Sequence, residues 1–202
     1  MPLTKYNKKR NFKNTPEPKG SNGVKNLFRF TVQRHDATRL HYDFRLELGG
    51  VLKSWAVPKG PSMNPEDKRL AVMVEDHPVS YIHFEGVIPE GNYGAGTVEV
   101  WDKGAFFPVN KELEKISERQ ALLDLKKGEL KIFLKGDKLQ GGFVLVRLKD
   151  DKNWLLIKHK DEYAVNKKYD PEIFSKAALK KKSSSHTIRE NAKLKKRKSA
   201  SG

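Results

Sequence analysis

The sequence predicts a mainly β protein, a single closed β-barrel of about eight strands with one or two short helices and disordered basic tails. Many short segments in its middle part alternate apolar and polar side chains or form apolar runs that end at Gly or Pro. Only one segment has the apolar spacing of a helix. Closing many short strands into a barrel also removes exposed sheet edges.

Charge divides the chain into three parts. The net charge is +16 over 202 residues, yet residues 1–27 alone carry seven Lys/Arg and one acid, and residues 176–202 carry ten and one. Residues 28–175 are therefore almost neutral. We expect a flexible basic arm over 1–27, a folded domain over 28–175 and a flexible Lys/Ser-rich tail over 176–202. Arms of this kind contact polyphosphates such as nucleic acids, although they can also serve only solubility.

Several classes of protein are excluded by composition. The chain has no cysteine, so disulfides, zinc ribbons and cysteine nucleophiles are absent. No apolar run follows the basic residues of the N-terminus, and no stretch approaches the roughly 18 apolar residues of a membrane span. We expect a cytoplasmic, nucleoid-associated monomer without a membrane partner.

The expected strands follow from alternation and from turn residues. Gly49-Gly50 separates two of them and indicates a hairpin. The strands are expected at 28–34, 40–48, 51–57, 69–74, 80–84, 97–101, 129–134, 142–148 and 154–158.

One helix is expected over residues 111–127, and Gly128 is a suitable stop signal. The glycine-rich stretch 90–96 is interpreted as a turn. It lacks the Gly-Lys-Ser/Thr ending of a phosphate-binding P-loop, and a strand rather than a helix follows it.

The segment 40–47 carries the most informative pattern. Residues two apart on a strand share a face. One face is apolar and suits a barrel interior: Leu40, Tyr42, Phe44 and Leu46. The other face is expected to point to solvent and carries His41, Asp43, Arg45 and Glu47. A His, an acid and an Arg in consecutive outward positions are unusual for a solvated strand.

These side chains suggest a metal site. His41 and Asp43 can converge on one ion, and His35 at the entrance of the strand can supply a third ligand. Two imidazoles and a carboxylate with open positions suit Mn²⁺, Fe²⁺, Co²⁺ or Zn²⁺. The alternative is a surface strand with incidental histidines.

Other candidate residues give weaker signals. His77 and Tyr81 can present a proton donor and a hydroxyl to one anion, but their sequence context by itself favours a packed loop. The isolated basic residues Lys59 and Arg69 can contact phosphate or simply be solvated. The remaining histidines are expected to be structural or exposed: His83, His159 and His186.

Three stretches resemble the 3′-phosphoesterase module of bacterial DNA ligase D, which also occurs as a stand-alone protein. They are FTVQRHDATRLHYDFRLELGGVLKSWAVPKGPS, RLAVMVEDHPVSYIHFEGVIPEGNYGAGTVEVWDKG and LQGGFVLVRLKDDKNWLLIKHKDEYA, and they cover roughly residues 28–165. The resemblance implies an eight-stranded barrel with its site on the outer surface. It also implies manganese-dependent removal of 3′-terminal ribonucleosides and 3′-phosphates, which leaves a 3′-OH for repair synthesis or ligation.

The resemblance also implies residue roles. His35, His41 and Asp43 would hold the metal, Mn²⁺ with Co²⁺ or Zn²⁺ as alternatives, although which histidine is the non-ligand stays open. The scissile phosphate would be held by Arg45, His77 and Tyr81. Secondary functional positions would be Lys59, Arg69 and Glu75. The substrates would be DNA or RNA-tipped DNA 3′ ends, with a ligase, polymerase or end-binding repair protein supplied in trans.

Two rival interpretations remain. A non-catalytic, basic nucleic-acid-binding barrel would explain the tails but not the polar face of the strand at 40–47. An oxygenase-like barrel would explain two histidines and a carboxylate, which also bind non-haem iron, but not the basic tails.

Overall fold

The computed structural model describes residues 3–20 and 27–175. The chain forms two compact units, Met1–Tyr169 and Asp170–Gly202. The described part of the second unit is a 3₁₀ helix, η2 (Pro171–Phe174), which Asp170 caps through the backbone N–H of Glu172. The predicted tail over 176–202 lies outside the described residues.

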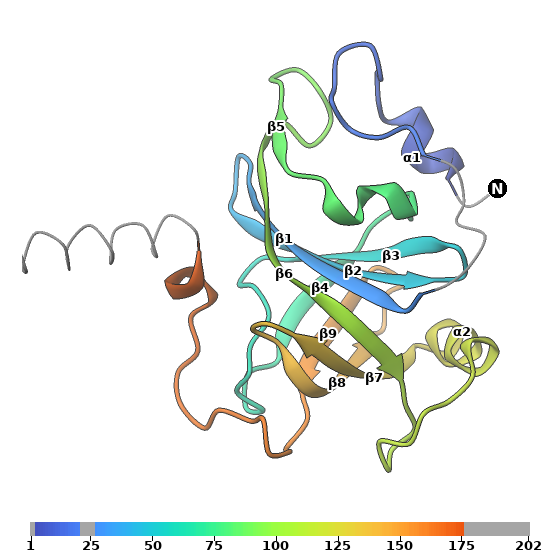
Figure 1. The fold of residues 1–202 in the computed structure, drawn as a ribbon, viewed down its shortest axis with the longest axis vertical. Helices are drawn as coiled ribbons and strands as arrows, with labels where there is room; N and C mark the ends of the chain where they lie inside the picture. Colours follow the sequence, from blue (N-terminus) through green and yellow to red (C-terminus); the bar gives the residue numbers. More distant parts are fainter. Residues whose placement is uncertain (1–2, 21–26, 176–202) are drawn as a thin grey trace, which may run out of the picture. The chain divides into compact units, whose positions relative to one another are not determined.

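The first unit contains a closed antiparallel barrel, which confirms the predicted fold class (Figure 1). Eight strands follow one another in the order β1-β2-β3-β4-β9-β8-β7-β6, and pairing of β1 with β6 closes the barrel. The short strand β5 (Gly86–Ile88) pairs with the start of β6 outside this ring. The barrel strands are β1 (Arg29–Asp36), β2 (His41–Leu48), β3 (Val51–Val57), β4 (Arg69–Met73), β6 (Gly96–Pro108), β7 (Glu129–Gly136), β8 (Gln140–Arg147) and β9 (Asn153–Lys158).

Large apolar side chains fill the barrel interior, as the alternation of the strands predicts. In β2 the expected inward residues are buried, but Leu40 precedes the strand and is only half-buried. The largest interior side chains are Phe30, Tyr42, Phe44, Leu46, Trp55, Phe106, Leu130, Phe143 and Trp154.

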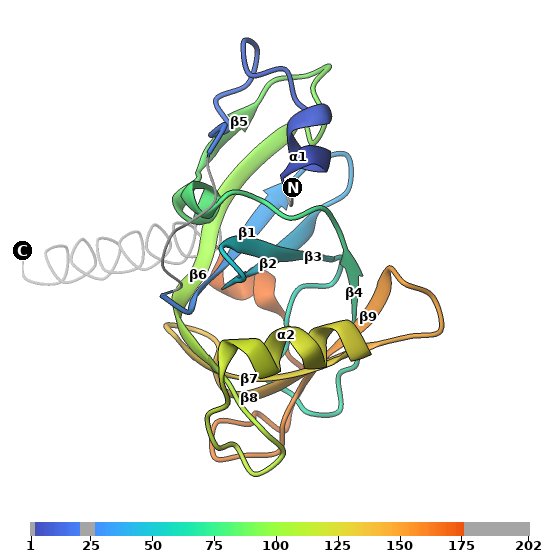
Figure 2. The ribbon, with the colours of Figure 1, turned by 90° about the vertical axis from the view of Figure 1, so that its right-hand side faces the viewer.

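A second apolar layer covers the outside of β1, β2 and β3, which corrects the predicted flexible arm. Residues 3–20, called the N-terminal segment below, begin with helix α1 (Thr4–Lys8) and lie at the same end of the barrel as β5 (Figures 1 and 2). Tyr6 is fully buried in a cluster with Leu52, Tyr81 and Ile82. The Tyr6 hydroxyl also donates to the carbonyl of Pro18 over 2.7 Å. Apolar burial therefore outweighs the basic composition of this stretch.

Helix α2 (Glu118–Lys127) is shorter than predicted. The side chain of Asn110 accepts hydrogen bonds from the backbone N–H groups of Glu112 and Glu114, and this turn replaces the first helical turns. Ser117 then caps the helix by accepting from the backbone N–H of Gln120. Gly128 ends the helix with φ 100°, which confirms the predicted stop.

The segment expected as a strand at 80–84 is instead the 3₁₀ helix η1 (Val79–His83). Its backbone N–H groups bond three residues back, from Tyr81 to Pro78 and from Phe84 to Tyr81. The predicted strand at 97–101 is the start of the much longer β6. The other strands lie within two residues of their predicted bounds.

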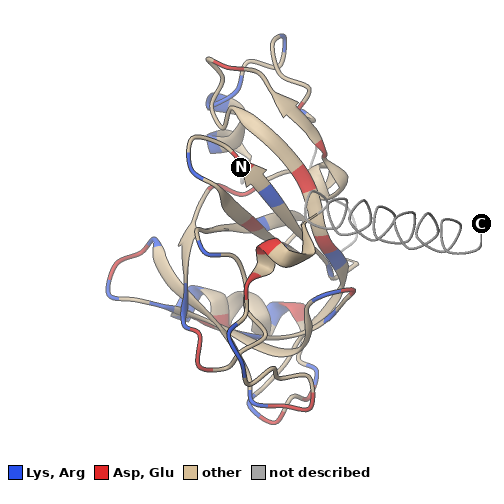
Figure 3. Ribbon diagram, turned by 90° about the vertical axis from the view of Figure 1, so that its left-hand side faces the viewer, with Lys and Arg blue, Asp and Glu red and all other residues tan. Residues whose placement is uncertain are grey.

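Charges of both signs are distributed along the described barrel (Figure 3). This agrees with the nearly neutral composition of residues 28–175. In the described part of the chain, no helix has the length and hydropathy needed to cross a membrane.

Candidate active site

A pocket of ≈ 300 Å³ lies on the outer wall of the barrel, where β1, β2 and β3 meet η1 and the N-terminal segment. Charged, polar and apolar side chains all contribute to its lining. The lining residues are Arg10, Glu17, His35, Ala37, His41, Asp43, Arg45, Ala56, Val74, Glu75, His77, Tyr81, Ile88, Tyr93 and Gly94.

Strand pairing brings the three predicted metal ligands together. His35 on β1 lies directly opposite His41 on β2, and Asp43 follows two residues later on the same face. The Asp43 carboxylate lies 3.6 Å from His35 Nδ1 and 3.6 Å from His41 Nε2. Ligand atoms of all three residues lie within 4.8 Å of one another, a spacing that one metal ion can bridge.

Backbone carbonyls orient both imidazoles toward this point. His35 Nε2 donates to the carbonyl of Gly94, and His41 Nδ1 donates to that of Arg39, each over 2.9 Å. These contacts leave the lone pairs of His35 Nδ1 and His41 Nε2 directed at Asp43. Histidines that bind metals are held in the same way by their second nitrogen. The residues present therefore fit a divalent cation.

The electrostatics of Asp43 favour its ionised form. Burial by itself raises the pKa of Asp43, but Arg45 and the two neighbouring histidines more than offset this and hold its pKa below the usual range. The carboxylate is thus charged across the physiological range, as a metal ligand must be.

Arg45 is held rigidly beside Asp43. Its guanidinium donates to Gln33 Oε1 over 2.7 Å, to Ser54 Oγ over 3.0 Å and to Asp43 Oδ2 over 2.9 Å. Gln33 in turn donates to the backbone carbonyl of Tyr81 and so links Arg45 to η1. Two of the five guanidinium N–H groups have no acceptor among the described residues, which leaves them for an oxyanion.

His77 and Tyr81 enter the same pocket from the other side. His77 Nδ1 donates to the carbonyl of Glu75 over 2.8 Å, so its Nε2 accepts from Arg10, 3.2 Å away. The Tyr81 hydroxyl donates to Glu17 Oε1 over 3.0 Å. The structure thus brings together every residue that the resemblance places at the metal or the scissile phosphate.

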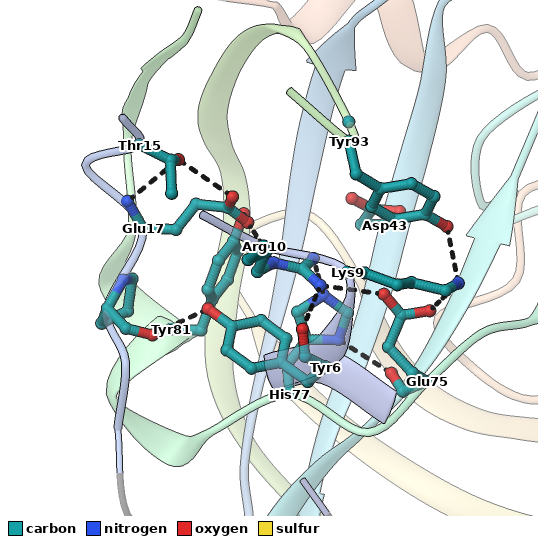
Figure 4. Close-up of polar contacts among 12 residues, drawn as sticks. Tyr6, Lys9, Arg10, Thr15, Glu17, Asp43, Glu75, His77, Tyr81 and Tyr93 are labelled. Carbon is teal, nitrogen blue, oxygen red and sulfur yellow. Dashed lines mark hydrogen bonds and ion pairs between the residues drawn. The ribbon is translucent and has the colours of Figure 1, made fainter. Parts of the chain in front are cut away.

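Arg10 and Glu17 are site residues that the sequence did not predict (Figure 4). Arg10 forms ion pairs with Glu17 at 2.8 Å and with Glu75 at 3.0 Å, and its side chain is 5% exposed. The basic composition of residues 1–27 predicted a flexible arm, so no residue of this stretch was expected in the site. Two signals could have found them: the aromatic residues Tyr6 and Phe12, and a single acid in a basic stretch.

Burial also sets the protonation of the groups around Arg10. Burial, together with the charges of Arg45 and Arg10, lowers the pKa of His77 well below 6.5. Burial raises the pKa of the Tyr81 hydroxyl far above its ordinary value. Burial raises the pKa of Glu75, but its bonds to Lys9 and Arg10 outweigh that and leave it lowered. His77 is therefore neutral, Tyr81 keeps its proton and Glu75 is charged.

Lys59 and Arg69 do not line the pocket, whereas Glu75 does. Arg69 donates to Asp67 over 2.7 Å and to the carbonyls of Lys59 and Tyr169. It shares a strand face with Ala71, which is fully buried in the barrel. Lys59 is exposed just beyond β3.

The polar face of β2 is not open to solvent, which corrects the expectation from the sequence. The side chains of Asp43 and Arg45 are 10% and 3% exposed, and that of His41 is 23% exposed. Glu47, on the same face, is buried in an ion pair with Arg29 and takes no part in the pocket. His83 and His159 are exposed, and His186 lies outside the described residues.

An antiparallel barrel with two imidazoles, a carboxylate and a guanidinium on its outer wall defines a class of protein that can hold a divalent cation beside an oxyanion. The chain belongs to the family of DNA ligase D 3′-phosphoesterase domains, whose family model matches residues 33–147.

Known proteins from three bacteria illustrate the family. The chain is 52% identical over 166 residues to the multifunctional non-homologous end joining protein LigD of Pseudomonas aeruginosa, a match that covers 79% of this chain and 19% of that protein. It is 42% identical over 166 residues to the protein of that name from Mycolicibacterium smegmatis, covering 79% and 21%. It is also 42% identical over 164 residues to the multifunctional non-homologous end joining DNA repair protein LigD of Mycobacterium tuberculosis, covering 79% and 20%. The chain thus spans about a fifth of the length of these relatives.

Proposed function

We propose that this protein is a manganese-dependent phosphoesterase that removes 3′-terminal ribonucleosides and 3′-phosphates from DNA and leaves a 3′-OH. The observation that carries the proposal is the joining of a three-ligand metal site to an immobilised guanidinium in one pocket, in a member of the 3′-phosphoesterase family.

On this proposal, His35, His41 and Asp43 hold Mn²⁺, with Co²⁺ or Zn²⁺ as alternatives. A bound divalent ion withdraws electrons from a phosphate oxygen and lowers the pKa of a bound water. The protein contributes the fixed orientation of the two imidazoles and the permanent charge of Asp43.

Arg45 binds the scissile phosphate through its two remaining N–H groups. Three hydrogen bonds already fix the plane of the guanidinium, so little reorganisation is needed when charge builds up on the phosphate oxygens. Arg10 supplies a second guanidinium from the opposite wall, next to His77. The two cations thus flank the position where the phosphate would bind.

Tyr81 is the better placed donor of a proton to the leaving oxygen. Its hydroxyl carries a proton that now points to Glu17. His77 has no proton on Nε2 in this arrangement, because its Nδ1–H is committed to the carbonyl of Glu75. His77 instead accepts from Arg10 and positions that guanidinium.

The substrates we propose are DNA and RNA-tipped DNA 3′ ends in the cytoplasm, on which a ligase, polymerase or end-binding protein acts in trans. The names of the relatives place those proteins in non-homologous end joining, and this supports a role in preparing breaks for repair.

The test is hydrolysis of two matched primer–templates, one ending in a single 3′-ribonucleotide and one in a 3′-phosphate. Each is incubated with metal-free protein, alone or with Mn²⁺, Co²⁺, Zn²⁺ or Mg²⁺. We expect metal-dependent conversion of both to a 3′-OH end, and no conversion by Asp43→Asn. Binding of both DNAs without hydrolysis under any metal would contradict the proposal and favour a binding-only barrel.

A further inference from the structure

Tyr93 is a large aromatic side chain at the mouth of the pocket. It lines the pocket and is nevertheless 49% exposed. Figure 4 shows its hydroxyl joined to the ammonium group of Lys9, and Asp43 lines the same pocket. A half-exposed ring that lines a pocket offers an apolar face to a ligand and a hydroxyl that can hydrogen-bond.

The loop that carries Tyr93 packs against the end of β1. Its glycines Gly91, Gly94 and Gly96 have positive φ of 81°, 77° and 142°. A Cβ at Gly96 would come within 2.4 Å of the carbonyl oxygen of Asp36, so the loop packs closely on the end of β1. The carbonyl of Gly94 also accepts from His35. The position of the ring is therefore tied to that of a metal ligand.

Lys9 fixes the outer end of the ring. Its ammonium group lies 3.0 Å from the Tyr93 hydroxyl, 2.9 Å from Glu75 Oε2 and 4.3 Å from the ring centroid. Lys9 therefore links Tyr93 to Glu75, a second residue that lines the pocket, and holds Tyr93 in place. The Tyr93 ring is thus preorganised, and it would lose little conformational entropy when a ligand binds to it.

We propose that Tyr93 is the stacking platform for a nucleobase that flanks the scissile phosphate. This inference rests on the proposed function and names the part of the substrate that the pocket mouth recognises. The Arg45 side chain is only 3% exposed, so a nucleoside attached to a phosphate bound there has to extend toward the mouth of the pocket. Stacking on an aromatic ring suits an enzyme that must accept ends of any sequence, because every base offers a π-face.

The experiment compares Tyr93→Ala and Tyr93→Phe with the wild-type protein on three versions of the 3′-ribonucleotide primer–template. One is intact, one lacks the terminal base and one lacks the penultimate base. We expect Tyr93→Ala to lower kcat/KM on the intact DNA about 5- to 100-fold, the range of base–aromatic stacking. Tyr93→Phe, which keeps the ring, should stay within about twofold. The deficit of Tyr93→Ala should vanish on the DNA that lacks the stacked base, and this identifies which base it is.

Three results would overturn the inference. An equal deficit on all three DNAs, or weakened Mn²⁺ binding by Tyr93→Ala, would mean that the residue only supports the loop behind His35. An unchanged kcat/KM of Tyr93→Ala on the intact DNA would mean that Tyr93 does not contact the substrate. Failure of the proposed function is distinguishable, because the wild-type protein would then hydrolyse none of the three DNAs.

Discussion

Asp43 belongs both to the proposed metal site and to the proposed phosphate-binding site. Its carboxylate faces the imidazoles of His35 and His41 and also accepts a hydrogen bond from Arg45. Replacing any of these three neighbours therefore changes the charge around the buried Asp43 carboxylate. The loss of stability should differ between His41 and Arg45, because their side chains are exposed to different extents.

The first prediction compares His41→Ala with Arg45→Ala. His41 is 23% exposed, so its loss should cost within about 1 kcal/mol of unfolding free energy while weakening Mn²⁺ binding. Loss of Arg45 leaves Asp43 buried without its cation and should cost about 3 kcal/mol. Urea denaturation and calorimetric Mn²⁺ titration measure both effects. Unaltered Mn²⁺ affinity in His41→Ala would refute the ligand assignment.

The second prediction concerns His77 and pH. Its folded-state pKa is depressed by burial and by two arginines, so neutral His77 contributes stability that is present above the ordinary pKa of 6.5 and lost as pH falls below it. Between pH 7 and 5.5 the wild-type protein should lose about 1 kcal/mol more unfolding free energy than His77→Gln. Denaturation at pH 7.5, 6.5 and 5.5 tests this. Parallel pH curves for the two proteins would show that another group is responsible.

At the scale of elements, the N-terminal segment completes the site. It supplies the apolar cover over Leu52 and Ile82, and it also brings Arg10 and Glu17 to His77 and Tyr81. Its hydrogen bonds to Glu75, η1, His77 and Tyr93 join residues 64 to 84 positions apart in sequence. A stretch that composition alone assigns to a flexible arm is thus part of the folded candidate site.

The third prediction is that Arg10→Ala reduces turnover at saturating substrate, whereas Lys13→Ala does not. Both changes remove one positive charge from the same segment, but Arg10 is buried among Glu17 and Glu75 and Lys13 is exposed. We expect at least a tenfold fall in kcat for Arg10→Ala, about the effect of one lost charge-assisted contact to the transition state. If both substitutions had equally small effects on kcat, residues 3–20 would contribute only non-specific contacts to DNA.

The fourth prediction separates Lys59, on the connection between β3 and β4, from Arg69, the first residue of β4. Lys59 is exposed, and a terminal phosphate monoester carries nearly two charges where a diester carries one. Lys59→Ala should therefore impair release of 3′-phosphate more than removal of a ribonucleoside. Arg69→Ala breaks a link to Asp67 and should lower the melting temperature. The prediction fails if Lys59→Ala slows both reactions equally.

At the scale of the whole molecule, most of the excess positive charge lies outside the sequence that forms the barrel. Residues 28–175 are almost neutral, while 176–202 carry ten basic residues and one acid. Attraction to DNA over a distance should therefore come mainly from outside the barrel.

The fifth prediction is that removing residues 176–202 flattens the salt dependence of DNA binding without changing turnover at saturating substrate. If about six Lys/Arg of the full chain engage duplex DNA, log affinity should fall against log salt with a slope near −5. The shortened protein should have a slope less than half as steep. Fluorescence anisotropy between 50 and 200 mM salt measures it, and an unchanged slope would exclude this region from DNA binding.

The sequence by itself determined the closed barrel, the hairpin at Gly49-Gly50, the inward face of β2 and the end of α2 at Gly128. These features depend on strand alternation and turn chemistry, which are local. Together with the family resemblance, they also brought His35, His41 and Asp43 to one point, because pairing of adjacent strands fixes which residues lie opposite each other.

Only the tertiary structure decided which residues cover the proposed metal site. Burial of Arg45, the entry of Arg10 and Glu17, and the separation of Arg69 from the pocket all depend on contacts between distant parts of the chain. Alternation of apolar and polar residues predicts which side chains share a face of a strand. It does not predict whether that face is exposed to solvent or covered by another segment. Here Tyr6 and its apolar neighbours gain enough burial to hold a basic stretch against the barrel, and that packing encloses the site.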